Sequence, residues 1–114
     1  MEFNSNPAPT PNDSDSLWDV LIHYLGKVYP PVSEDIKGLM KQRDEFGIQK
    51  YGTPLQLNNG RNFAQDALEE GLDLMVYLYG YLLQTSDPAV AEQTDYLLAN
   101  ALEIVEYLHE RITE

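Results

Sequence analysis

Four residues at helical spacing form the pattern in this sequence that is best suited to chemistry: Asp66, Glu70, Asp73 and Tyr77. At about 100° per residue, these positions lie on one side of a helix. Glu70 and Asp73 are one turn apart in an E-x-x-D arrangement, so their carboxylates can share a hard divalent cation such as Mg²⁺. The ordinary alternative for acids on a surface helix is a solvated face.

The residues that follow this acidic stripe favour a metal site over a solvated face. The stripe continues into Tyr77, Gly80 and Tyr81, in a region that we expect to be buried. A buried carboxylate must be protonated, paired or bound to metal, because an isolated buried charge is very costly. Arg111 is the only Lys or Arg after position 61. Cations bound from solvent are therefore a reasonable way to neutralise these carboxylates.

A second candidate region is the turn-rich stretch from Lys50 to Arg61, which is dense in Gly, Pro and Asn. Lys50 and Arg61 bring positive charge that suits phosphate groups, and Tyr51 offers a ring on which a nucleotide base could stack. The competing interpretation is a plain turn in which leucines anchor the loop and Arg61 pairs with acids at a helix start. The two interpretations are compatible.

The charge of the chain is −12 and is unevenly distributed. Residues 1–61 hold 8 acids and 6 bases (−2), whereas residues 62–114 hold 11 acids and one base (−10). Such a surface repels nucleic acid backbones, which argues against a conventional DNA or RNA binder. Two interpretations remain: the acids bind divalent cations, or the protein is an acidic mimic that occupies a basic groove of a partner. The absence of cysteine excludes thiolate zinc and thiol catalysis.

The first half of the chain is predicted to contain two helices after a flexible, disordered arm. The arm, residues 1–13, holds three prolines and one large apolar residue, too little to offset the cost of ordering. A cap at Asp13 or Ser14 precedes a first helix over about residues 15–28. Ser33 is the expected cap of a second helix, which ends softly around Gly47.

The second half is predicted to contain the two longer helices. Asn62 can cap a third helix that runs to about Gln84, and Pro88 suits the first turn of a fourth. No stretch alternates as a strand would. The expected fold is therefore all-α, a four-helix bundle in a single domain over residues 14–114, with an ordered loop between the second and third helices.

The sequence DALEEGLDLMVYL at residues 66–78 resembles the second acidic helix of the MazG-like all-α nucleoside triphosphate pyrophosphohydrolases. Upstream, RDEFGIQKYGTPL at residues 43–55, followed by NGRN at 59–62, looks like the small phage and bacterial branch of that superfamily. The resemblance covers about residues 33–84, roughly half of the chain.

The resemblance implies a four-helix bundle that assembles as a homodimer or homotetramer. It also implies hydrolysis of a nucleoside or deoxynucleoside triphosphate to a monophosphate and pyrophosphate, with Mg²⁺, or Mn²⁺ in its place. The implied metal ligands are Asp44, Glu45, Glu70 and Asp73, and Glu45 or Asp66 is the implied base. Ile48 occupies the position of a third acid in the family's E-E-x-x-E pattern.

The predicted substrate contacts are drawn from both candidate regions: Lys50, Tyr51, Asn59, Arg61 and Tyr77. The alternative function is that of a non-catalytic acidic interaction protein, or a nucleotide-sequestering protein, on the same bundle. The negative charge and Ile48 favour this alternative. No apolar run approaches membrane-spanning length and no signal peptide is recognisable, so we expect a cytoplasmic protein that binds no membrane.

Overall fold

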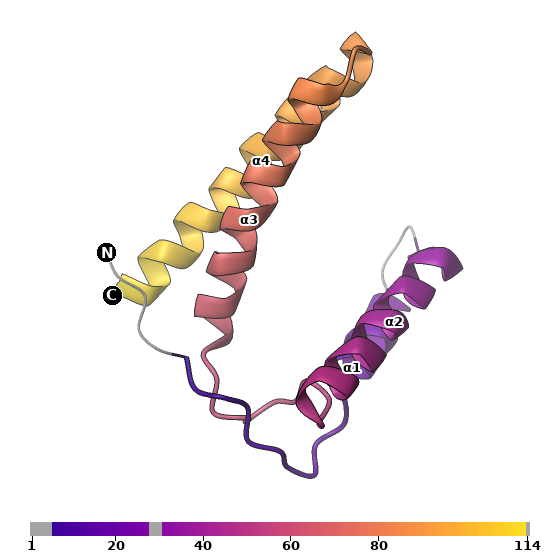
Figure 1. The fold of residues 1–114 in the computed structure, drawn as a ribbon, viewed down its shortest axis with the longest axis vertical. Helices are drawn as coiled ribbons and strands as arrows, with labels where there is room; N and C mark the ends of the chain where they lie inside the picture. The colour runs from indigo at the N-terminus through magenta and orange to yellow at the C-terminus, as the bar shows by residue number, and fades with distance from the viewer. Residues whose placement is uncertain (1–5, 28–30, 114) are drawn as a thin grey trace. The chain divides into compact units, whose positions relative to one another are not determined.

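The computed structural model describes residues 6–27 and 31–113, which are all-helical, with four helices and no strand (Figure 1). The helices are α1 (Leu17–Leu25), α2 (Glu34–Tyr51), α3 (Phe63–Gln84) and α4 (Pro88–Thr113). This confirms the all-α prediction. None of the helices in the described ranges is long and apolar enough to cross a bilayer.

The described chain divides into two compact units, and the single domain expected over residues 14–114 stays a prediction. The amino-terminal unit comprises Pro7–Arg61, in which α1 packs on α2. The hairpin unit comprises Asn6 with residues 62–113, in which α3 packs on α4. Each predicted site residue therefore belongs to one unit or the other, and assembly of the units into one bundle stays a prediction.

The first helix begins later than predicted, because a contact with the rest of its unit fixes its start. The Leu17 amide donates to the Leu55 carbonyl at 2.6 Å. Ser16, the residue before the helix, makes no side-chain cap; its hydroxyl donates to Asp44 Oδ1 at 2.9 Å. The cap expected at Asp13 or Ser14 is therefore wrong. Residue 28, the predicted helix end, lies outside the described residues.

The second helix has the predicted start and a later end. Ser33 Oγ accepts from the Ile36 amide at 3.2 Å, as a cap does. The helix continues through Gly47 and stops at Gly52, whose φ of 74° is a left-handed conformation that glycine adopts without strain. Lys50 and Tyr51 consequently lie on the last turn of α2 rather than in the loop.

The loop after α2 is held by buried polar side chains and by the arm that we predicted to be disordered. Gln56 Nε2 donates to the carbonyls of Asn12 at 2.7 Å and Ser14 at 2.6 Å. Gln56 Oε1 accepts from the Asn12 amide at 3.1 Å and from Thr53 Oγ1 at 3.2 Å. Residues 6–13 of the arm are thus hydrogen-bonded at several points, whereas residues 1–5 lie outside the described residues.

The hairpin unit has an apolar seam between α3 and α4, which lie side by side (Figure 1). Asn62 caps α3 as predicted, accepting from the Gln65 amide at 3.1 Å. Leu68, Ala101 and Val105 are the buried apolar residues of the seam. Gly71 permits close approach, since a Cβ placed there would lie 2.9 Å from Val105 Cγ2.

Candidate functional site

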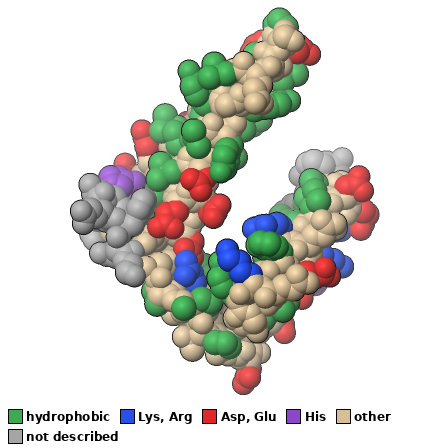
Figure 2. Space-filling view, viewed as in Figure 1, with side chains coloured by type: hydrophobic (Ala, Val, Ile, Leu, Met, Phe, Trp, Pro, Cys, Tyr) green, Lys and Arg blue, Asp and Glu red, His purple; other side chains and the backbone are tan. Residues whose placement is uncertain are grey.

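The acidic stripe lies on the side of α3 that faces away from α4. Gly71 contacts Val105 of α4, and helical geometry puts Glu70, Asp73 and Tyr77 on the opposite side. All three are exposed in the hairpin unit, Tyr77 to 73%. Figure 2 shows acidic side chains gathered near the start of α3 and apolar side chains farther along the helix. The burial expected for the stripe is therefore not found within this unit.

Asp66 is the one member of the stripe that is half-buried, and a residue of the arm contacts it. Asn6 Nδ2 donates to Asp66 Oδ1 at 2.8 Å, while Asn6 Oδ1 accepts from the Asn62 amide at 2.9 Å. Asn6 therefore both extends the α3 cap and orients the carboxylate of a candidate base. Sequence reasoning missed Asn6, because no local pattern signals a contact that spans 60 residues.

The predicted metal ligands are divided between the two units. Glu70 and Asp73 belong to the hairpin unit, whereas Asp44 and Glu45 lie on α2 of the amino-terminal unit. Among the described residues, no group of three or more His, Asp or Glu side chains is arranged to hold a metal ion. What the hairpin unit offers by itself is a pair of exposed carboxylates, a donor type that Mg²⁺ commonly uses together with water and phosphate.

The two acids on α2 have different surroundings. Asp44 is half-buried and its Oδ1 accepts from the Ser16 hydroxyl at 2.9 Å, a bond that ties α2 to the start of α1. Glu45 is exposed. Of the two, Glu45 is the side chain that can reach a solvent ligand without breaking a contact within its unit.

Lys50 and Tyr51 form a cation and ring pair at the end of α2. The Lys50 ammonium lies 5.2 Å from the centre of the Tyr51 ring, within range of a cation–π attraction, and both side chains are exposed. The negative carboxyl end of the helix dipole also favours a cation at this position. An anion with an attached aromatic group could bind from solvent, with the anion on the Lys50 ammonium and the aromatic group on the Tyr51 ring.

Asn59 and Arg61 have contacts of the kind expected for loop anchors. Asn59 is 2% exposed; its carbonyl accepts from the Thr10 amide at 2.8 Å and its Oδ1 from the Arg61 amide at 3.0 Å. Arg61 NH1 donates to the Pro7 carbonyl at 2.8 Å. These bonds hold the arm on the loop. Phosphate binding by either residue stays a prediction.

The chain was compared with protein-family models, curated proteins and solved structures, and none of the three comparisons returned a match.

Proposed function

We propose that this protein is a Mg²⁺-dependent nucleoside triphosphate pyrophosphohydrolase, which adds water across the α–β phosphoanhydride to give a monophosphate and pyrophosphate. The observation that supports the proposal most directly is the exposed Glu70 and Asp73 pair on α3, one turn apart and on the side opposite Gly71. A bound divalent ion would supply charge that stabilises the triphosphate in the transition state.

In this proposal the carboxylates have two roles. Glu70 and Asp73 bind the ion, and Asp44 and Glu45 are the further ligands that the resemblance implies. Asp66 or Glu45 accepts the proton of the attacking water. The Asn6 side-chain Nδ2 donates to the Asp66 carboxylate and orients it, which is what a base that acts on a fixed substrate requires.

The remaining predicted residues bind the substrate. Lys50 and Arg61 neutralise the β and γ phosphates, and the Tyr51 ring stacks on the base. Tyr77 lies one turn beyond Asp73 on the same side of α3, with an exposed ring and hydroxyl that can contact the sugar or base. Asn59 acts through the loop that it anchors.

The direct test is pyrophosphate release from a panel of canonical and modified nucleoside triphosphates, with Mg²⁺ or Mn²⁺. Glu70→Gln and Asp73→Asn should each lower the rate at least about 100-fold and abolish Mn²⁺ binding in calorimetric titration. Neither should lower stability, because each relieves repulsion between neighbouring acids. Glu103→Gln, which neutralises an exposed acid on α4, is the matched control and should behave as the parent protein.

Unchanged ion affinity in both α3 variants would mean that the stripe is a solvated face. Turnover that is equally slow in the parent protein and both variants would remove the hydrolase proposal.

The second candidate function is that of an acidic interaction protein or a nucleotide-sequestering protein. The observation that favours it is the charge of residues 62–114, which is −10. Nucleotide binding without pyrophosphate release would identify a sequestering protein. Binding to a basic partner that 0.5 M salt abolishes, with no nucleotide affinity, would identify an acidic mimic, since surface attraction is screened by salt at about that concentration.

The proposal extends to assembly and location. We expect a homodimer or homotetramer, since the helices carry more apolar surface than each unit covers by itself. Action on a free nucleotide pool fits a cytoplasmic location.

A further inference from the structure

The arm that lies on the loop after α2 has a proline at every second position: Pro7, Pro9 and Pro11. Proline has a fixed φ and also biases the residue before it toward an extended conformation. This stretch therefore has fewer conformations to lose when it becomes ordered on the loop. We call residues 7–14 the strap. The strap and the loop both belong to the amino-terminal unit, and the strap is the indigo segment in Figure 1.

The strap bonds the loop through residues that alternate with its prolines. The Thr10 amide donates to the Asn59 carbonyl at 2.8 Å. The Asn12 amide donates to Gln56 Oε1 at 3.1 Å, and Asn12 Nδ2 donates to the Leu57 carbonyl at 2.8 Å. The prolines have no N–H group that would need a partner elsewhere. The strap is thus suited by its sequence to bond a single neighbouring segment.

The conformation of the loop depends on the strap. Gln56 is 4% exposed, and the acceptors of its Nε2 are the strap carbonyls of Asn12 and Ser14. Without the strap this buried amide would lose both acceptors, which destabilises the loop. Asn59, the other deeply buried side chain of the loop, would lose its bond to Thr10.

The docked strap does not cover the two cations predicted to bind phosphate. Lys50 is exposed. Arg61 is half-buried, and its NH1 donates to the Pro7 carbonyl at 2.8 Å. The strap therefore orients the Arg61 guanidinium while part of this side chain still faces solvent. Such an arrangement favours a role in positioning over a role in blocking.

A buried donor on the loop would also gain from an anion. Among the residues that the structure describes, Asn59 Nδ2 is the buried side-chain atom without a hydrogen-bond partner. Exposed residues flank it on both sides, Asn58 and Gly60, so the amide lies just beneath the surface of the loop. A phosphate oxygen that accepts from this donor would remove the cost of leaving it unpaired. An anion would thereby stabilise the loop conformation that the strap holds.

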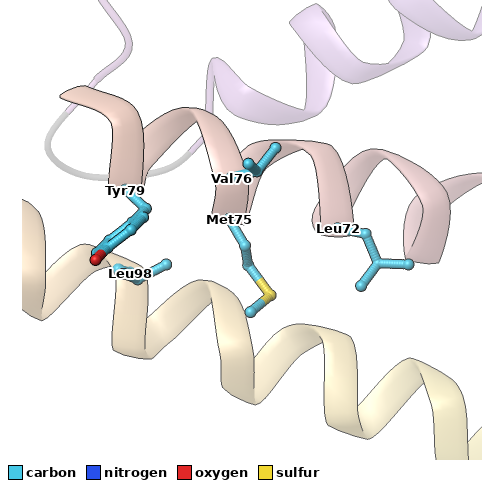
Figure 3. Close-up of a pocket in the computed structure, with 5 residues that line it drawn as sticks. All are labelled: Leu72, Met75, Val76, Tyr79 and Leu98. Atoms are coloured by element: carbon cyan, nitrogen blue, oxygen red, sulfur yellow. The ribbon is translucent and has the colours of Figure 1, made fainter. Parts of the chain in front are cut away.

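The groove between α3 and α4 does not offer a comparable place for phosphate. It has a volume of about 360 Å³, and Figure 3 shows the side chains that line it: Leu72, Met75, Val76, Tyr79 and Leu98. None of them carries a positive charge or an amide. Because phosphate binding depends on charged or polar donors, the loop is the better candidate.

We propose that the strap is a part of the candidate phosphate site, and that strap docking and triphosphate binding strengthen each other. The identity of the ligand rests on the function proposed above. The coupling is reciprocal: the factor by which a docked strap tightens triphosphate binding equals the factor by which bound triphosphate favours docking. A strap that only covered the site would give coupling of the opposite sign.

Hydrogen exchange of the Thr10 and Asn12 amides in the full chain measures strap docking, since both donate to the loop. The probe is an α,β-imido nucleoside triphosphate with Mg²⁺, which cannot be hydrolysed between the α and β phosphates. Both amides should be protected in the parent protein without the probe. The bound probe should slow exchange at Thr10 about fivefold or more.

Asn12→Ala removes the side-chain bond to the Leu57 carbonyl from an exposed position, so the helices should fold as before. Exchange at Thr10 should become about tenfold faster. The dissociation constant of the probe should rise severalfold, but by no more than the factor by which the probe slows exchange in the parent. Gln42→Ala, which removes an exposed amide side chain from α2, is the matched control and should change neither quantity.

Three outcomes would overturn the proposal and leave the hydrolase function standing. The first is an unprotected Thr10 amide in a parent protein that binds the probe. The second is faster exchange at Thr10 when the probe binds, which would mean that the strap covers the site. The third is equal probe affinity in Asn12→Ala and the parent although Thr10 exchanges faster in the variant. A protected Thr10 amide in a parent that binds no probe would instead refute the nucleotide function, and the coupling with it.

Discussion

The two units of this protein differ in the residues that each buries in its own interior. In the amino-terminal unit the buried side chains are polar, Thr53, Gln56 and Asn59, and neither α1 nor α2 has a buried residue. The hairpin unit also buries two polar residues, Gln65 and Thr94, but it adds the buried apolar residues Leu68, Ala101 and Val105, which the amino-terminal unit does not match. One unit therefore depends on hydrogen bonds between a loop and an arm, and the other on a narrow apolar seam.

This difference also separates the candidate functions of the two regions. Polar anchors fix a loop in one conformation, because each buried donor or acceptor that loses its partner carries a desolvation cost. Two helices that pack along a narrow apolar seam leave further apolar side chains exposed. Another helix can bury these side chains by packing on them. The loop is thus suited to hold a ligand-binding side chain in place. The hairpin is suited to pack against further helices.

The largest expected effect is in the seam. Leu68→Ala should lower the free energy of unfolding by about 3 kcal/mol, because it removes a 2% exposed side chain and leaves a cavity. Hydrogen exchange of α3 and α4 amides measures the loss. Leu83→Ala, at a position 67% exposed, is the control and should cost far less. Equal losses would show that Leu68 does not mark the core.

The next effect is in the polar loop. Gln56→Ala should cost about 2 kcal/mol, since the Asn12 and Ser14 carbonyls and the Thr53 hydroxyl lose their common partner. Trp18 is the only tryptophan and lies in the same unit beside Leu55, so its fluorescence can follow unfolding. A variant that unfolds at the parent's denaturant concentration would contradict the assignment of Gln56 as the anchor.

A smaller effect should come from the close contact between the helices. Gly71→Ala should cost about 1–2 kcal/mol, because overpacking against Val105 exceeds the helix propensity that alanine gains. In a double-mutant cycle, Val105→Ala should relieve part of this cost. If Gly71→Ala stabilises the protein by itself, the seam is looser at this point than the structure indicates.

The smallest expected effect on stability is the difference between removing the Arg61 side chain and removing the Lys50 side chain. Arg61→Ala should lose about 1 kcal/mol with its bond to the Pro7 carbonyl, whereas Lys50→Ala should lose little, since its contact with Tyr51 is exposed. Each of the two variants should weaken triphosphate binding about tenfold. Each should weaken monophosphate binding less. Reduced stability of Arg61→Ala with unchanged triphosphate affinity would leave Arg61 as a loop anchor only.

Local sequence patterns determined where α2, α3 and α4 begin. Ser33 and Asn62 cap α2 and α3 as predicted, and Pro88 begins α4, because a cap or a proline acts within one turn of its own position. The E-x-x-D spacing likewise fixed Glu70 and Asp73 on one side of α3, since helical periodicity needs no tertiary information.

Contacts between distant residues were decided by the tertiary structure alone. The start of α1 follows the Leu17 bond to Leu55, and the arm is held by Gln56 and Asn59 across more than 40 residues. The orientation of Asp66 depends on Asn6 in the same way. Burial of the acidic stripe was inferred from neighbouring apolar residues, but helical periodicity determines which residues share a side and not what covers that side. Coverage depends on packing between elements, and here α4 packs on the opposite side of α3.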